Sequence, residues 1–323
     1  MNSFLKKQMN LAKEKIFESK NIYIASHVQP DGDNLGSMLA LGLALKKINE
    51  NVYMVKTDPI PSDFMFLPGV ENIKEIIDYG DVDLFITLDS SDIERLGQNK
   101  RLIDKANFVI NIDHHISNTD YGDINIVDST SGSTAELVFE LINILNIKVD
   151  KDIGTCIYTG ISTDTGSFMY DNTRPETHLI AAELLKIGID KKNIILNVYQ
   201  NKSIEKTKLF IKTIENLKTF IDNKVAVVHV TKDILRGTGA KMEDTDGIIS
   251  FIRDIEPVEV AIVLKELETK EIKVSMRSKK YVNVSEICSK FNGGGHIRAA
   301  GCTIYNSLEF AETALINELK KIL

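Results

Sequence analysis

Short aliphatic runs alternate with longer amphipathic stretches over the first 190 residues of the chain. The aliphatic runs have strand length and are rich in β-branched residues; they cover residues 21–26, 51–56, 82–89, 107–113 and 123–128. Helical periodicity covers residues 35–48, 134–145 and 152–163. Alternation of this kind predicts an α/β fold, in which helices flank a mostly parallel sheet.

The rest of the chain has a different pattern. A Lys-rich stretch over residues 189–222 has helical character and no run that predicts a strand. Strand-like runs then cover residues 224–231, 258–267 and 271–278, and a Gly-rich turn precedes a final helical stretch. We therefore predict an α/β domain over residues 1–188, a helical connector over 189–222 and a smaller α+β domain over 223–323.

Composition and charge narrow the function classes. The chain has 323 residues, of which 43% are hydrophobic, so it can fill the cores of about two domains. A formal net charge of −7 argues against an extended surface for long nucleic acid, but metal ions can still neutralise a small anionic substrate. The N-terminal amphipathic helix has no apolar segment suited to secretion, and the three scattered cysteines suit a reducing compartment. These features predict a cytoplasmic protein that does not associate with membranes.

Polar side chains follow three of the predicted strands. His27 comes after the first strand, Asp89 ends the third and Asp113 ends the fourth. One polar residue after a strand is commonly part of a turn. In a parallel sheet, however, ligands bind at the carboxyl ends of the strands, so three such ends with metal-ligand side chains predict a site.

The first motif, HVQPDGDN, places His27, Asp31 and Asp33 between a strand and a helix. Gly32 lets the turn fold tightly, so that both carboxylates can point to one region. Imidazole and carboxylate ligands suit Mn²⁺, Mg²⁺ or Fe²⁺ better than a structural zinc ion. Taken alone, the P-D-G-D segment is equally consistent with an ordinary turn.

The second motif, IDHHIS, contains Asp113, His114 and His115, and three of the six histidines of the chain fall in these two motifs. Asp89 and Asp164 add two further acids at element ends. Two hard cations need a bridging carboxylate and several terminal ligands. The predicted arrangement puts His27 and Asp31 on one metal, puts Asp33, His114 and Asp164 on the other, lets Asp89 bridge them and uses Asp113 to orient a histidine.

The ordered motifs H-x-x-x-D-G-D, a strand-end Asp, D-H-H and a downstream Asp resemble those of the DHH phosphoesterase family. The C-terminal SMRS and FNGGGHIRAAG segments are similar to the substrate-binding domain associated with that family, so the resemblance covers nearly the whole chain. It implies the ligand roles above, with His115 facing the scissile phosphate. His115 would either donate a hydrogen bond to a phosphoryl oxygen or protonate the leaving group.

The C-terminal segments predict a second site, which holds the substrate. Successive glycines let backbone N–H groups approach a phosphate closely, and an arginine can bind a terminal phosphate through two hydrogen bonds. For Arg298, the sequence is consistent either with a second phosphate ligand or with a surface charge. The predicted substrate-binding residues are Arg277, Ser278, Gly293, Gly294, Gly295, His296 and Arg298.

The resemblance implies a phosphoesterase with two divalent cations, for which we expect Mn²⁺ with Mg²⁺ as the alternative. The expected substrates are short RNA oligonucleotides and dinucleotides such as pApA, cut to 5′-mononucleotides, and nucleoside bisphosphates such as 3′-phosphoadenosine-5′-phosphate. Long duplex nucleic acid is not expected as a partner, and a homodimer is left open. The alternatives are a cyclic-dinucleotide phosphodiesterase, which would use the same metal site, and a nucleotide-binding sensor without catalysis.

Overall fold

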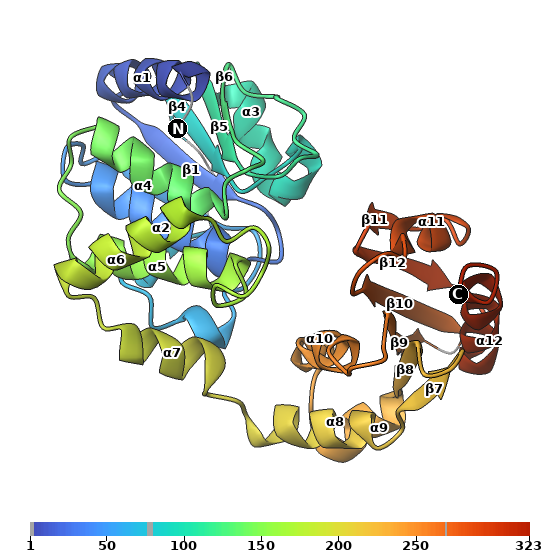
Figure 1. Ribbon diagram of the computed structural model, residues 1–323. Coiled ribbons are helices and arrows are strands. Elements are labelled where there is room, and N and C mark those ends of the chain that lie inside the picture. Colours follow the sequence, from blue (N-terminus) through green and yellow to red (C-terminus); the bar gives the residue numbers. More distant parts are fainter. Residues whose placement is uncertain (1–2, 76–79, 269) are drawn as a thin grey trace. The chain divides into compact units, whose positions relative to one another are not determined.

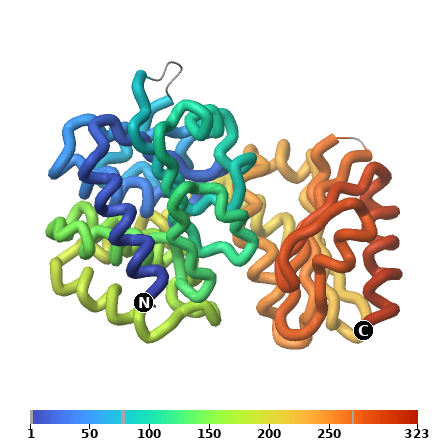
Figure 2. Tube along the Cα trace, turned by 90° about the horizontal axis from the view of Figure 1, so that it is seen from above, coloured from blue at the N-terminus to red at the C-terminus, as the bar shows by residue number. Residues whose placement is uncertain are grey.

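The computed structural model describes residues 3–75, 80–268 and 270–323, which form two compact units, residues 1–201 and 202–323 (Figure 1). The chain begins in the first unit with α1, traced in blue in Figure 2, and ends in the second unit after α12, traced in red. The first two residues of the predicted N-terminal helix lie outside the described residues.

The first unit is built on a parallel sheet of six strands in the order β3-β2-β1-β4-β5-β6. The predicted α/β class is confirmed. The elements of this unit are α1 (Ser3–Glu18), β1 (Ile22–Ser26), α2 (Gly32–Leu45), β2 (Val52–Val55), η1 (Ser62–Phe64), η2 (Val70–Asn72), β3 (Ile73–Lys74), β4 (Leu84–Leu88), η3 (Ile93–Lys100), α3 (Arg101–Lys105), β5 (Val109–Asp113), β6 (Ile124–Val127), α4 (Thr134–Ile144), α5 (Lys151–Asp164), α6 (Pro175–Ile187) and α7 (Lys191–Tyr199).

Both faces of the parallel sheet are buried at its central strands β1, β4 and β5, which explains why these strands are mostly hydrophobic. Side chains of successive strand residues point to opposite faces, so Ile22 and Ile24 pack under α1, α2, α4 and α5, while Tyr23 and Ala25 pack toward α3 and η3. Helix α2 begins at a side-chain cap: the Asp31 carboxylate accepts from the backbone N–H of Asn34 at 3.0 Å. The start of α2 is thereby fixed next to the end of β1.

The second unit contains a mixed sheet of six strands in the order β11-β12-β10-β9-β8-β7, in which only β8 and β9 pair in parallel among the named strands. Its elements are α8 (Ile204–Ile214), β7 (Lys218–Phe220), β8 (Val225–Val230), α9 (Lys232–Thr238), η4 (Met242–Thr245), α10 (Ile248–Arg253), β9 (Val260–Glu268), β10 (Glu271–Ser278), α11 (Val284–Ser289), β11 (Gly294–His296), β12 (Ala299–Ile304) and α12 (Leu308–Leu319).

One face of this sheet packs under α11 and α12, and the other face packs on α8, α9 and α10 through apolar side chains of β8 and β9. Strand β7 corrects the expectation that residues 189–222 contain no strand. It is a three-residue edge strand with largely exposed side chains, so no aliphatic run reveals it. The predicted Gly-rich turn likewise contains a strand, β11, which pairs with β12.

Candidate metal centre

The carboxyl ends of β1, β4 and β5 are neighbours in the parallel sheet, because β4 pairs with both β1 and β5. His27 follows β1, Asp89 follows β4 and Asp113 is the last residue of β5. Asp89 has a φ of 53°, a left-handed conformation that turns the chain away from the strand. All three polar residues are buried at this one edge of the sheet.

Three overlapping groups of side chains at this edge each bring their ligand atoms within 4.8 Å of one another. Asp89 and His114 each belong to two of the groups, which therefore form one continuous centre. The groups are His27, Asp31 and Asp89; Asp33, His114 and Asp164; and Asp89, His114 and His115.

His27 and His114 present their Nε2 atoms to carboxylates. His27 Nε2 lies 3.3 Å from Asp89, and its Nδ1 is 2.6 Å from the carbonyl oxygen of Val28. His114 Nε2 lies 3.4 Å from Asp164 and 3.8 Å from Asp89. With Nδ1 of His27 donating to a backbone carbonyl, its Nε2 is left as the ligand atom, an arrangement usual for metal-binding histidines.

The electrostatics of the centre favour bound cations. Burial, together with the charges of Asp89, Asp164 and Asp31, raises the pKa of Asp33 well above its usual value, and burial raises the pKa of Asp164 to about 6. Burial also disfavours the Asp89 carboxylate, but hydrogen bonding and the charge of His27 outweigh it and lower the pKa of Asp89 to about 2. Several carboxylates packed this closely suit hard divalent cations, which accept oxygen and imidazole ligands.

Asp113 is fully buried and holds His115 instead of joining the three groups. Its Oδ1 accepts from His115 Nδ1 at 2.7 Å and from the backbone N–H of His114 at 2.9 Å. The amide of Asn118 donates to its Oδ2 at 2.6 Å. Burial lowers the pKa of His115, but the hydrogen bond to Asp113 and the charge of Asp89 outweigh burial and raise that pKa to about 9. The ring is therefore oriented and kept protonated near neutral pH.

The start of α4 orients two of the acids, which the sequence analysis did not predict. The backbone N–H groups of Thr134 and Ala135 donate to the two oxygens of Asp33 at 2.7 and 2.9 Å, and the Thr134 hydroxyl donates to Asp89 at 2.9 Å. Ser133 caps the helix through a hydrogen bond from the backbone N–H of Glu136. Thr134 itself therefore positions the centre.

Removing the Thr134 hydroxyl should weaken cation binding. Thr134→Val keeps the shape of this buried side chain but deletes its hydrogen bond to Asp89. Outer partners of metal ligands typically change affinity by about 10- to 100-fold, so we expect the affinity for a divalent cation to fall at least about tenfold. Calorimetric titration measures this affinity, and Thr155→Val, whose hydroxyl bonds only within α5, is the control. Equal affinities in both variants would contradict the positioning role.

Close packing of α2 against α5 brings Asp33 toward the C-terminal end of α5, where Asp164 lies. A Cβ at Gly32 would lie 2.4 Å from the Thr163 hydroxyl, and one at Gly160 would lie 2.8 Å from Asp33 Oδ1. Glycine at both positions therefore permits the helix approach that places these two acids in the same ligand group.

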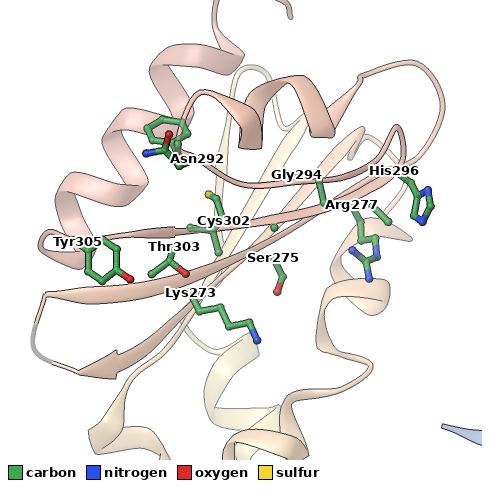
Figure 3. A pocket seen from close by; sticks show the side chains of 14 residues that line it. Lys273, Ser275, Arg277, Asn292, Gly294, His296, Cys302, Thr303 and Tyr305 are labelled. Carbon is green, nitrogen blue, oxygen red and sulfur yellow. The ribbon is translucent and has the colours of Figure 1, made fainter. Parts of the chain in front are cut away.

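In the second unit, part of the predicted substrate-binding set lines a hollow of about 810 Å³ (Figure 3). Arg277, Gly294 and His296 line it. Ser278 and Arg298 instead donate to the carbonyl oxygen of Val282, at 2.6 and 2.9 Å. These two contacts stabilise the turn after β10, and neither side chain lines this hollow.

Gly293 and Gly295 do not line the hollow either, but they permit the close approach of the chain to β12. A Cβ at Gly293 would lie 2.2 Å from the carbonyl oxygen of Gly301, and Gly295 has a φ of +143°. The hollow also includes Lys273 and Ser275, which the sequence analysis did not single out. A lysine on a strand is usually a solvated surface residue, so the sequence alone did not indicate that Lys273 lines this hollow.

Comparison with known proteins identifies the class to which this fold and centre belong. Residues 21–161 match the N-terminal domain of the DHH family, and residues 222–323 match the DHHA1 domain. The chain belongs to the DHH family, and it is a metal-dependent hydrolase.

Among its relatives, the bifunctional oligoribonuclease and PAP phosphatase NrnA of Thermus thermophilus is 35% identical over 88% of this chain and 84% of its own. NrnA of Bacillus subtilis is 30% identical over 88% and 90%. A crystal structure of an exopolyphosphatase-related protein from Bacteroides fragilis superposes with a TM-score of 0.91 at 30% identity, covering 98% of this chain and 96% of that one. No helix in the described part of the chain is long and apolar enough to cross a membrane.

Proposed function

We propose that this hydrolase cleaves the phosphodiester bonds of very short oligoribonucleotides, including linear dinucleotides such as pApA, to release 5′-mononucleotides. We further propose that it removes the 3′-phosphate from 3′-phosphoadenosine-5′-phosphate. The observation that carries the proposal is the set of three overlapping ligand groups around Asp89, which provides enough ligands for two cations. The names of the relatives supply the substrate class.

The donor set fits two divalent cations, for which we propose Mn²⁺, with Mg²⁺ as the alternative. The proposed ligands are His27 and Asp31 for one cation, Asp33, His114 and Asp164 for the other, and Asp89 between them. Two cations held by these residues would supply Lewis-acid stabilisation of phosphoryl charge and would activate water for attack on phosphorus.

The chain's own contribution to the reaction is to orient groups and to supply a proton donor. Asp113 holds the Nδ1 side of His115, which leaves Nε2 to donate toward an oxygen of the scissile phosphate. The neighbouring Asn118 occupies the other oxygen of Asp113, so that this carboxylate has little freedom to rotate. These contacts support the proposal that His115 and Asp113 act together in catalysis.

Arg277, Gly294 and His296 are proposed to hold a part of the substrate away from the scissile bond. They line one hollow, and the Arg277 guanidinium suits a phosphate group. Gly293 and Gly295 support this loop through their close backbone packing. Ser278 and Arg298 are proposed to contribute indirectly, because their side chains fix the adjoining turn through Val282.

Hydrolysis of cyclic dinucleotides is the second candidate function. The cyclic-di-AMP phosphodiesterase PdeA of Listeria monocytogenes is 26% identical over 95% of this chain, but this chain spans only 48% of that protein. Its lower similarity and greater length favour the first proposal. A cytoplasmic location is also proposed, consistent with three buried free cysteines.

The decisive test is a substrate panel with the full-length protein and Mn²⁺. We expect RNA 2-mers to 5-mers, pApA and 3′-phosphoadenosine-5′-phosphate to be turned over, and 24-mer RNA, pyrophosphate and c-di-AMP to be cleaved at least about 100-fold less efficiently, measured as kcat/KM from mass-spectrometric product analysis. Preference for c-di-AMP would favour the second candidate. Nucleotide binding without turnover of any substrate would indicate a sensor and overturn the proposal.

A further inference from the structure

One face of the sheet in the second unit is apolar on β8 and β9 and polar on β10. Helices α8, α9 and α10 bury that face through apolar side chains of β8 and β9. On β10 the same face carries Lys273, Ser275 and Arg277, since alternate residues of a strand point the same way. Figure 3 shows these three side chains along one strand, at the hollow that also contains Gly294 and His296.

Two lysines face each other across this surface. In the antiparallel pairing of β10 with β9, Lys273 lies directly opposite Lys265. Opposite residues of paired strands have their Cβ atoms about 5 Å apart, and like charges at that separation destabilise a sheet. The pair therefore has a cost in the free energy of folding that a bound anion would offset.

Lys265 is half-buried, and its pKa is lowered by burial and by the charges of Lys273 and Arg277. The carboxylate of Asp246 acts in the opposite direction, but it lies too far away for an ion pair, and within residues 3–75, 80–268 and 270–323 neither Lys265 nor Lys273 has a carboxylate within 4.0 Å. Burying a charge costs free energy unless the charge is paired. The unpaired lysines thus leave a positive potential on this surface.

Lys265, Lys273, Ser275 and Arg277 form a cationic strip on this face, and two hollows meet at it. The larger contains Lys273 and the smaller, of about 290 Å³, contains Lys265, while Ser275 and Arg277 line both. The Cα atoms of Lys273 and Arg277 are about 13 Å apart along the strand, given about 3.3 Å per residue. Opposite Ser275 lies Gly301, which has no side chain, so the strip is open between the two ends.

We propose that Lys265 and Lys273 bind a phosphate group of the substrate in addition to the one held at Arg277. The strip would then distinguish substrates by their number of phosphates, with Ser275 offering a hydroxyl between the two positions. This inference rests on the proposed function, because it concerns how the same hydrolase would recognise a second non-scissile phosphate of its substrate.

The test compares wild-type protein with Lys273→Gln on two substrates that differ in phosphate number. A 5′-phosphorylated RNA trinucleotide carries three phosphates, and an unphosphorylated dinucleotide carries only the scissile one. Loss of one charge-assisted contact should raise the KM for the trinucleotide about tenfold more than the KM for the dinucleotide. The kcat values should not change. The slope of log KM against log salt should fall by about 0.7 for the trinucleotide.

Folding stability provides an independent readout. Because Lys273→Gln removes a like-charge pair, its Tm without substrate at low salt should rise by about 1–3 °C, whereas damage to the fold would lower it. Lys320→Gln is the matched control, since it removes an equal charge just after α12, which packs on the opposite face of the sheet. Its KM ratio between the two substrates should match that of wild type.

An unaltered KM ratio in Lys273→Gln, with the wild-type protein active on both substrates, would overturn the phosphate site and leave the proposed function intact. If the wild-type protein turns over neither substrate, the proposed function fails. In that event, binding of the trinucleotide in EDTA, measured by calorimetry, still tests the site: about tenfold weaker binding by Lys273→Gln supports it, and equal binding overturns it.

Discussion

Replacing His114 by alanine should abolish turnover while leaving the fold intact. His114 belongs to two of the three ligand groups, so its loss affects both the Asp33–Asp164 side of the centre and Asp89. Cations stabilise phosphoryl transition states by several kcal/mol. Losing one of them therefore corresponds to a fall in kcat/KM of at least about 10³-fold.

The fold should survive this substitution because the His114 ring does not contribute to the hydrophobic core. The ring is 14% exposed, and besides its contacts with the acids of the centre its Nδ1 lies 3.3 Å from the carbonyl oxygen of Ser131. Circular dichroism and Tm in EDTA measure the fold, and Mn²⁺ titration measures the lost site. His178→Ala removes an exposed histidine of α6 and should stay active. Near-normal activity of His114→Ala would exclude the proposed metal assignment.

The parallel sheet could be predicted from the sequence because burial on both faces requires aliphatic strands. Strands β1, β2, β4, β5 and β6 all fall within predicted runs. Strands β7 and β11 could not be predicted in this way. The former is an exposed edge strand, and the latter contains two glycines, so neither has side chains that report a buried face.

The metal centre could be anticipated for a related reason. His27, Asp89 and His114 follow strands that are adjacent in the sheet, and ligands generally bind at the carboxyl ends of parallel strands. The contacts of Thr134 and Asn118 depend on tertiary geometry: Thr134 lies 45 residues from Asp89 in sequence. Residues that act through hydrogen bonds of this kind have no recognisable pattern in the local sequence. The cross-strand pairing of Lys265 with Lys273 could not be predicted either, because it depends on the register of β9 and β10.

Without metal, the first unit should lose stability as the pH rises from 5 to 9. The pKa of Asp164 is raised by burial to about 6, so the folded state keeps a proton that the unfolded state releases, and stability falls as pH rises from about 4 through 6. The pKa of His115 is raised to about 9 by Asp113 and Asp89, which outweigh burial; its contribution is complete below pH 6.5 and is lost as pH rises through 9. Both contributions have the same sign.

Several groups with a lowered pKa, among them Asp89 and His229, have the opposite sign but do not alter the expected result. The lowered pKa of Asp89, about 2, affects stability only as pH falls below its ordinary value of 3.8, which is outside this window. His229, in the second unit, has a pKa lowered by burial, so its contribution increases with pH. Measuring the difference in Tm with and without metal at each pH removes the effect of His229, because it lies outside the proposed ligand set.

Divalent cations should reverse this pH dependence, because they compete with protons for the same carboxylates and imidazoles. At about 100 times the dissociation constant, one bound cation contributes about 2.7 kcal/mol, which corresponds to a rise in Tm of about 5–10 °C. Scanning calorimetry with excess Mn²⁺ or EDTA should show this difference growing from pH 5.5 to pH 8. Asp164→Asn, which removes a ligand carboxylate that lies 3.4 Å from His114 Nε2, should flatten the metal-free profile and reduce the response to Mn²⁺. A difference in Tm that is independent of pH would mean that cations do not bind at these acids.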